Sequence, residues 1–228
     1  DAGGVSASMM GHIYEYFSQY ILDRQANPRD DVMSEIATST FPDTGERPSV
    51  DDLLGLAFIL FGAGQETTVR LFTTGMQILL ERPEIMSELR GDDSLVTKFV
   101  DETLRFDTPV KGLFRVARED ADVGGVTVPA GATLMILWGA GNRDPLQFPE
   151  PETFDLHRPN ANRALSFGHG IHYCVGAPLA RLEGRVGWQA LLRRLGNIHR
   201  IDDADYDYIE SFIIRGLNRL PLGFDPIK

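Results

Sequence analysis

The sequence is poor in cysteine, in basic residues and in long apolar runs. Its single cysteine, Cys174, excludes a disulfide within the chain, so folding needs no oxidising compartment. Lys and Arg number 22 against 33 Asp and Glu, a formal net charge of −11. A negative field of this size repels nucleic acid and anionic lipid, which argues against both as partners. The longest apolar stretch, 53–64, is shorter than the roughly 20 residues that span a bilayer. No signal peptide is visible, so we expect a cytoplasmic protein.

What is present is typical of a folded domain. Hydrophobic residues make up 43% and charged residues 24% of the 228, which excludes a disordered or low-complexity chain. At this length, folding buries about 70% of the surface that the unfolded chain exposes, enough for one large core or two small ones. The chain begins at Asp1 without methionine, so we expect it to be a piece of a longer protein.

The first half of the chain carries helical patterns. Apolar residues recur at helical spacing over 9–24. Ser49 and Asp52 have the form of a capping box and open a longer helix that ends before Pro83. The first half of that helix is apolar on all sides, so we expect it to cross the interior of the protein. Shorter helices are predicted over 31–37, from Pro83 onward and over 94–106.

The second half mixes strands with one long helix. Short strands are predicted at 113–116, within 122–128, where Gly124-Gly125 interrupts the run, and at 132–138. A polar, proline-rich connection over 142–162 follows, then a helix over 177–195 and short strands to the end of the chain. The predicted fold class is therefore mainly α with a small β part, without a visible domain boundary.

A cysteine flanked by glycines lies just before the last predicted helix, in the segment FGHGIHYCVG, 167–176. Glycines let the backbone coil tightly, and the positive end of the helix lies beside the sulfur. Both features favour the thiolate, the form in which cysteine binds a metal. From the residues alone two alternatives stay open. One is a buried structural cysteine, and the other is a zinc site shared with His169 and His172, for which no further histidine has a suitable spacing.

Glu102 and Arg105 lie three residues apart in a predicted helix and can form an ion pair on one face. Most such pairs are solvated and contribute less than about 1 kcal/mol. The apolar neighbours of this pair predict that it is at least partly covered.

The segment AGQETT, 63–68, places a glycine, an acid and two hydroxyls inside the long apolar helix. The glycine alone costs about 1 kcal/mol there, and a threonine hydroxyl can bond to the preceding turn and open the helix. The alternatives are a ligand site at this opening and a simple helix kink. A nucleotide loop is not favoured, because a helix rather than a strand precedes the glycines.

Together, in this order and spacing, these motifs resemble the cytochrome P450 family. The cysteine segment matches the family's haem-binding loop, Glu102 and Arg105 match its E-x-x-R pair, and the segment 63–68 is similar to its acid–alcohol motif. NRDP at 142–145 and Phe154-Asp155 resemble the soluble bacterial branch. The resemblance covers essentially the whole chain but only the C-terminal part of the family fold. We therefore expect residues 1–228 to form the C-terminal part of a P450 domain whose N-terminal helices are absent from this chain.

The resemblance implies haem b, iron protoporphyrin IX, as cofactor, with Cys174 as the proximal thiolate on the metal. Glu66 and Thr67 would deliver protons to iron-bound dioxygen, and Glu102 with Arg105 would hold the segment that carries the cysteine loop. The family's third ion-pair partner, often arginine, falls at Thr153, with Arg158 as a substitute. Further haem contacts are implied for Phe167 beside the sulfur, His172 and Arg115 at the propionates, and Gly168, Gly176 and Ala63.

Substrate contacts are implied for four apolar side chains, Val110, Leu113, Ile213 and Ile214, and they indicate a small apolar substrate. The two isoleucines fit an ordinary core equally well.

The implied activity is that of a haem-thiolate monooxygenase that inserts one atom of dioxygen into such a substrate. Electrons would come from a ferredoxin-type donor and its reductase, docking near Arg163, Arg181 and Arg185. The alternatives are a truncated haem-binding fragment without activity of its own, and a P450-like peroxygenase or isomerase.

Overall fold

The computed structural model describes residues 2–202 and 204–227, with side chains from residue 11 onward. The described chain is mainly α-helical with three small antiparallel sheets, which confirms the predicted fold class. It forms two compact units, Asp1–Gln65 and Glu66–Lys228, and the boundary between them falls inside the long helix α3 (Val50–Glu81).

The first unit consists of α1 (Ala2–Ala26), α2 (Val32–Thr38) and the beginning of α3. Its core joins Ile21 of α1, Ala37 of α2 and Leu53 and Leu54 of α3. The predicted capping box is confirmed: Asp52 N–H donates to Ser49 Oγ at 3.2 Å, and Ser49 N–H donates to Asp52 Oδ2 at 3.0 Å. Helix α1 begins earlier than the apolar spacing predicted.

The expectation that the apolar beginning of α3 crosses the protein interior is wrong for the described chain. Leu53, Leu54 and Ala57 are buried, but Leu56 and Ile59 on other sides of the helix are exposed, as are Leu60 and Phe61 further along it. The physical reason is that within this unit α1 and α2 cover one side of the helix. A helix that is apolar all round needs partners on every side, and this stretch has them on one.

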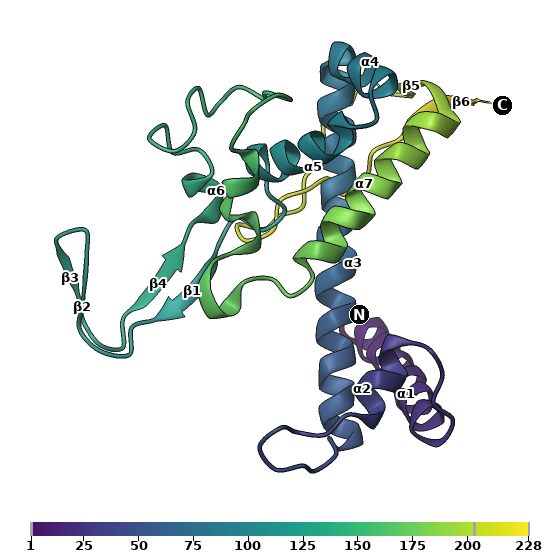
Figure 1. Ribbon diagram of the computed structural model, residues 1–228, viewed down its shortest axis with the longest axis vertical. Helices are drawn as coiled ribbons and strands as arrows, with labels where there is room; N and C mark the ends of the chain where they lie inside the picture. Colours follow the sequence, from purple (N-terminus) through teal and green to yellow (C-terminus); the bar gives the residue numbers. More distant parts are fainter. Residues whose placement is uncertain (1, 203, 228) are drawn as a thin grey trace. The chain divides into compact units, whose positions relative to one another are not determined.

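The core of the second unit is built from α5 (Leu95–Phe106), α7 (Ala177–Arg194), α4 (Pro83–Gly91) and the rest of α3. Trp188 of α7 is fully buried, and its ring contacts Phe99 of α5 edge-on at 5.2 Å and Phe72 of α3 at 5.5 Å between centroids. Gly75 of α3 lets the indole approach, because a Cβ there would lie 2.5 Å from Trp188 Cζ2. Figure 1 shows α5 and α7 side by side.

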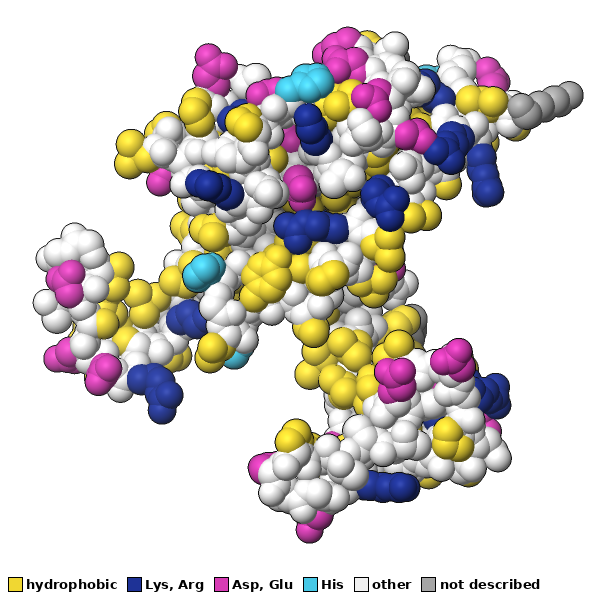
Figure 2. Space-filling view, in the orientation of Figure 1, with side chains coloured by type: hydrophobic (Ala, Val, Ile, Leu, Met, Phe, Trp, Pro, Cys, Tyr) yellow, Lys and Arg dark blue, Asp and Glu magenta, His cyan; other side chains and the backbone are white. Residues whose placement is uncertain are grey.

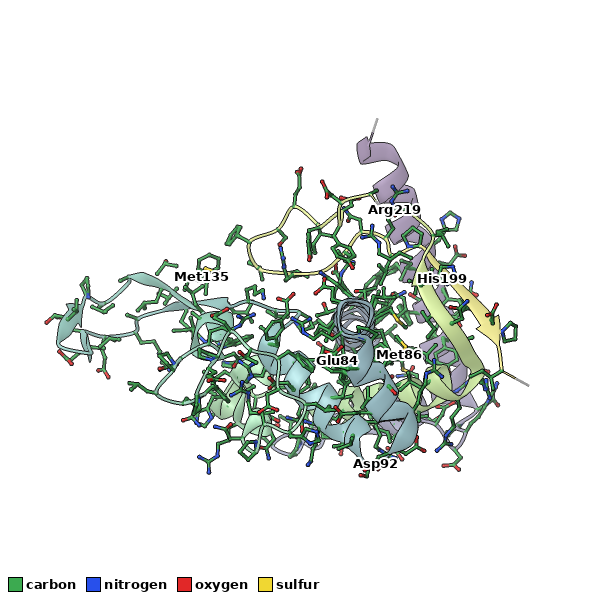
Figure 3. The ribbon with its side chains drawn as sticks, turned by 90° about the horizontal axis from the view of Figure 1, so that it is seen from above. Glu84, Met86, Asp92, Met135, His199 and Arg219 are labelled. Carbon is green, nitrogen blue, oxygen red and sulfur yellow. The ribbon has the colours of Figure 1, made fainter. Side chains whose placement is uncertain are left out.

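Two ribbons flank this helical core. Strand β1 (Leu113–Val116) pairs with β4 (Thr133–Ile136), and β5 (Leu195–Arg200) pairs with β6 (Leu222–Pro226). Seen from above in Figure 3, Met135 of β4 and His199 of β5 lie on opposite sides of the core, with Glu84 and Met86 of α4 between them. The ribbon β1–β4 therefore stands apart from the carboxyl-terminal strands.

The predicted strand segments are largely confirmed. The run 122–128 is a hairpin of β2 (Ala121–Val123) and β3 (Val126–Val128), whose turn residues Gly124 and Gly125 have φ of 61° and 84°. Such a turn favours glycine at both positions. The third strand ends earlier than predicted, because Trp138 begins the short helix α6 (Trp138–Gly141).

The long connection after α6 has little regular structure until three turns of 3-10 helix, η1 (Ala161–Arg163), η2 (Leu165–Phe167) and η3 (Gly170–His172). These turns lead the chain back to the start of α7. None of the helices that the structure describes is long and apolar enough to cross a membrane.

Candidate functional site

Cys174 lies in a tight loop between η3 and α7, and its side chain is exposed. Gly168 and Gly170 have φ of 74° and 76°, values that favour glycine, and they turn the chain towards the cysteine. Cys174 N–H then donates to the carbonyl of Phe167 at 2.9 Å, which closes the loop. The alternative of a buried structural cysteine is therefore wrong.

The helix α7 begins directly after this loop, at Ala177, and runs for 18 residues. Gly176 is its N-cap, and a Cβ at that position would lie 3.8 Å from Cys174 Sγ. The sulfur is thus presented at the positive end of a long helix, next to a residue without a side chain. The loop therefore leaves the sulfur accessible to a ligand that approaches from solvent.

The surface around the sulfur is apolar. Ile171 and Val175, on either side of Cys174 in the loop, are 97% and 86% exposed. Figure 2 shows hydrophobic side chains gathered over this loop and the adjacent start of α7. Exposed apolar side chains around a potential metal ligand suit a large, flat apolar ligand.

Two side chains predicted to contact haem propionates are without an anionic partner in the described part of the chain. His172, in the loop, makes no hydrogen bond or ion pair there, and Arg115 of β1 donates only to the carbonyl of Phe114, at 2.8 Å. A guanidinium without an acidic partner can donate hydrogen bonds to a carboxylate supplied by a ligand, and an imidazole N–H can do the same.

The alternative of a zinc site is not supported. The described residues contain no group of three or more His, Cys, Asp or Glu side chains that could hold a metal ion, so His169 and His172 do not complete a site with Cys174. A single exposed thiol with exposed apolar side chains beside it instead fits haem, whose porphyrin brings its own nitrogen ligands and carboxylates.

Helix α5 carries a fully buried ion pair. Arg105 Nε donates to Glu102 Oε2 at 2.7 Å and its Nη2 donates to Oε1 at 2.8 Å, and both side chains are inaccessible to solvent. The expected third position, Thr153, offers only its carbonyl, which accepts from Arg105 Nη2 at 3.1 Å. The third charged partner is Arg158, whose Nε donates to Glu102 Oε1 at 3.1 Å. A threonine side chain carries no charge, so Arg158 supplies the second guanidinium on this carboxylate and shares Oε1 with Arg105.

Sequence reasoning missed the role of Asn142, which connects this ion pair to the cysteine loop. Its carbonyl accepts from Arg105 Nη1 at 3.0 Å, its Oδ1 accepts from Leu165 N–H at 2.6 Å, and its Nδ2 donates to Ser166 Oγ at 2.9 Å. Asn142 is fully buried. The only signal in the sequence was its place at the start of the NRDP segment.

The acid–alcohol segment lies in an uninterrupted α-helix, so the predicted opening of α3 is not seen. Glu66 Oε1 accepts from Arg70 Nη2 at 3.2 Å, one turn further along, and Arg70 also donates to the carbonyl of Leu217. This i, i+4 pair stabilises the regular helix at Glu66. Thr67 is partly buried beside it, and Ala63 lies on the part of α3 that belongs to the first unit.

Three of the four predicted substrate residues lie together. Val110 and Ile214 form an antiparallel bridge, and Lys111 N–H donates to the carbonyl of Ile213 at 2.7 Å. Leu113 is exposed at the start of β1, three residues further on. Ile213 and Ile214 are only partly buried, which does not favour the alternative that they belong to an ordinary core.

A surface hollow of about 940 Å³ lies elsewhere in the second unit. It is lined mainly by polar and charged residues of α4 and the segment 149–163, among them Glu84, Glu88 and Arg163. None of the predicted haem or substrate residues lines it, and its charged walls do not suit an apolar substrate.

Comparisons with known proteins agree with this geometry. A family model described as "Cytochrome P450" matches residues 6–197. The chain is 38% identical to the cytochrome P450 monooxygenase PikC of Streptomyces venezuelae and 38% identical to 6-deoxyerythronolide B hydroxylase of Saccharopolyspora erythraea. Among solved structures it is similar to the Mycobacterium marinum cytochrome P450 CYP150A6 in the substrate-free form, with 42% identity and a TM-score of 0.91.

These matches cover most of this chain but about half of each relative. The alignments span 93% and 96% of this chain, against 51% of the PikC chain and 55% of the hydroxylase. For the Mycobacterium marinum structure the shares are 97% and 56%. The chain thus spans about half the length of the relatives it matches.

Proposed function

Because the chain belongs to the cytochrome P450 family, we propose that it is the carboxyl-terminal portion of a haem-thiolate monooxygenase. In this proposal Cys174 is the proximal ligand of the iron in haem b, and the whole protein inserts one atom of dioxygen into a small apolar molecule. The observation that carries the proposal is the exposed thiol of Cys174, held in a glycine loop directly before α7.

The residues around Cys174 would hold the haem in complementary ways. His172 and Arg115 would bind the propionates, and Phe167 would pack beside the sulfur. Gly168 and Gly176, which have no side chains, would let the porphyrin lie close to the loop. When bound, the haem supplies the activation of dioxygen, which no side chain of this chain provides.

Glu66 and Thr67 would move protons to the reacting oxygen. A carboxyl and a hydroxyl in successive helical positions can pass a proton through ordered water, which is general acid catalysis. The Arg70 guanidinium, one turn away, orients Glu66 in the described structure. Ala63, on the preceding turn of α3, offers a small side chain that leaves room for a ligand.

The substrate would be apolar and would contact Val110, Leu113, Ile213 and Ile214. The exposed ring of Phe212, in edge contact with Phe114 at 6.2 Å, extends this apolar surface. One relative is named as the hydroxylase of 6-deoxyerythronolide B, which supports a small-molecule substrate for this chain as well.

Electrons would come from a ferredoxin-type donor and its reductase, in the cytoplasm. Arg163 and Arg185 are exposed in the described structure and carry charge that an acidic donor would recognise. Such docking weakens as salt screens the charges, so the rate of electron delivery should fall with ionic strength.

Helix α7 exposes a stripe of apolar side chains. Leu179, Leu182 and Val186 lie at helical spacing on α7 and are exposed, and a monomeric soluble protein rarely exposes such stripes. We propose that an amino-terminal portion of the protein covers them. Mass spectrometry of the protein from its natural source tests this, because a polypeptide of this chain's 25.3 kDa would contradict it.

The decisive experiment is the absorption spectrum of the haem-loaded chain, reduced and exposed to carbon monoxide, for wild type and Cys174→Ser. We expect a strongly red-shifted Soret band in the wild type and its loss in the variant, because a serine oxygen is a poorer ligand for haem iron. A band that is unshifted in the wild type, or unchanged in the variant, overturns the assignment of Cys174. The mutation His199→Ser, far along the chain on β5, serves as a control and should leave the band in place.

A further inference from the structure

We propose that Arg181 positions the cysteine loop from within the fold, together with Asp101, rather than serving as a free cation for an electron donor. Arg181 lies on the second turn of α7. Its Nε donates to Asp101 Oδ1 of α5 at 2.9 Å, and its Nη1 donates to the hydroxyl of Tyr173 at 3.3 Å. The centre of its guanidinium lies 4.6 Å from the centroid of the Phe167 ring.

These contacts reach both ends of the loop that presents the sulfur. Tyr173 immediately precedes Cys174, and the carbonyl of Phe167 accepts the Cys174 N–H at 2.9 Å. The centroids of the Phe167 and Tyr173 rings lie 6.4 Å apart. The Arg181 guanidinium contacts both residues, lying over the ring of Phe167 and donating to the hydroxyl of Tyr173. Moving Arg181 would release both side chains that flank the closing hydrogen bond of the loop.

Asp101 joins Arg181 to helix α5. Its side chain is 16% exposed, and it lies on α5 directly before Glu102, whose ion pair with Arg105 is fully buried. Helix α5 therefore reaches the cysteine loop at two places. At the Leu165–Ser166 end it does so through Asn142 and through the carbonyl of Leu104, which accepts from Ser166 Oγ at 2.7 Å, and at Phe167 and Tyr173 it does so through Arg181. The contacts at these two places are independent, because they share no side chain.

The chemistry of the contacts selects arginine. A planar guanidinium can donate in two directions within its plane while its face lies on an aromatic ring, whereas the compact ammonium of lysine cannot. Burial lowers the pKa of Arg181, but its hydrogen bonds to Tyr173 and Asp101 outweigh that effect and leave the pKa raised. The side chain thus stays charged. Arg185, one turn further along α7, is exposed and makes none of these contacts.

Only the role of Cys174 as iron ligand rests on the proposed function. The contacts that hold the loop in place join residues of this chain and need no ligand. The test is the hydrogen exchange rate of the Cys174 backbone amide in the chain without haem. We expect Arg181→Gln to speed this exchange about tenfold or more, as loss of a charge-assisted hydrogen bond implies. Asp101→Asn should act in the same direction, and Arg185→Gln should leave the rate unchanged.

Exchange at the Asp92 amide, which caps α4 by donating to the carbonyl of Glu88 at 2.9 Å, separates local from global effects. Faster exchange at Cys174 with an unchanged rate at Asp92 supports the proposal. Equal rates in Arg181→Gln and Arg185→Gln overturn it. Should Arg181→Gln fail to fold, Arg181→Lys and Tyr173→Phe decide: the proposal expects both to speed exchange at Cys174, and wild-type rates in both contradict it.

Haem titration distinguishes this inference from the proposed function. If the exchange result holds and the haem-loaded wild type lacks the red-shifted band, the proposed iron ligation fails while Arg181 remains a positioning residue. If the band is present and the exchange rates of the two glutamine variants agree, Cys174 ligates iron without help from Arg181, and this inference is wrong.

Discussion

Arg158 and Glu102 are 56 residues apart in the chain and joined in the core of the second unit, with Arg158 Nε donating to Glu102 Oε1 at 3.1 Å. The same oxygen accepts the backbone N–H of Asp155 at 2.9 Å, and Arg105 contacts both oxygens of the carboxylate. The two guanidiniums also share the carbonyl of Thr153. This one carboxylate therefore fixes the irregular segment after α6 to the helix α5, and through Asn142 to the cysteine loop.

Removal of Arg158 should be strongly destabilising, because a buried carboxylate loses half of its charged partners. We expect Arg158→Ala to lower the free energy of unfolding by about 3–5 kcal/mol, the range for breaking a buried ion pair. Arg163→Ala, which removes an exposed arginine five residues away, should change it by less than about 0.5 kcal/mol. Urea denaturation of both variants provides the comparison, and similar values for the two would contradict the role given to Arg158.

Helix α3 needs glycine at position 75 for packing. A Cβ there would lie 2.5 Å from Trp188 Cζ2 and 3.3 Å from Phe99 Cε1, and neither buried ring has room to move away. We expect Gly75→Ala to destabilise the protein by about 1–3 kcal/mol through overpacking. Gly55→Ala on the same helix meets no atom within 4 Å and should stabilise by up to about 1 kcal/mol through helix propensity. The midpoint temperature of thermal unfolding should therefore fall in Gly75→Ala and rise in Gly55→Ala.

Capping residues and helix ends were readable from the sequence because they depend on neighbours in the chain. The Ser49–Asp52 capping box and the helix start at Pro83 are local features, and the structure contains both. The cysteine loop was recognisable for the same reason, since its glycines and the following helix are adjacent in sequence.

What could not be predicted depends on segments that meet only in three dimensions. Arg158 and Asn142 lie in a connection without periodicity, and their roles follow from how that connection folds back onto α5. The exposed side of α3 at Leu56 and Ile59 was expected to be buried, because an apolar pattern indicates a need for partners without showing whether the chain supplies them. Arg181 was expected to face a partner protein, since its contact with Asp101 spans 80 residues.

Asp31 should make the first unit sensitive to acid. Its carboxylate accepts from Arg24 Nε at 2.7 Å and from Ser34 N–H at 2.8 Å, where it caps α2. The hydrogen bond from Arg24, with that from Ser34, lowers the pKa of Asp31 from 3.8 to about 2. A lowered pKa contributes stability that is present above about pH 4 and is lost as the pH falls towards about 2.

Asp31→Asn should therefore unfold more readily than wild type at neutral pH, and the difference should shrink between about pH 4 and pH 2. Asp30→Asn, which changes the exposed neighbouring carboxylate, is the matched control and should follow the wild-type curve. Denaturation monitored by circular dichroism across this pH range measures both. A constant difference between Asp31→Asn and wild type across the range would show that the carboxylate charge is not what stabilises α2.

The final prediction separates the two hydroxyls of the acid–alcohol segment. Thr68 Oγ1 donates to Glu183 Oε2 of α7 at 3.3 Å, so its role is to join two helices. Thr67 is the hydroxyl proposed to deliver protons.

In the whole protein, with its electron donor and a substrate, Thr67→Ala should keep haem bound but lower product formation by about 100-fold, the lower end of what a positioned proton donor contributes. Electron consumption should fall much less, so the ratio of product to electrons consumed drops. Thr68→Ala removes the same chemical group one residue along and should leave that ratio unchanged while lowering stability slightly. A Thr67→Ala variant whose ratio matches that of wild type would show that protons reach the oxygen by a route that does not include this hydroxyl.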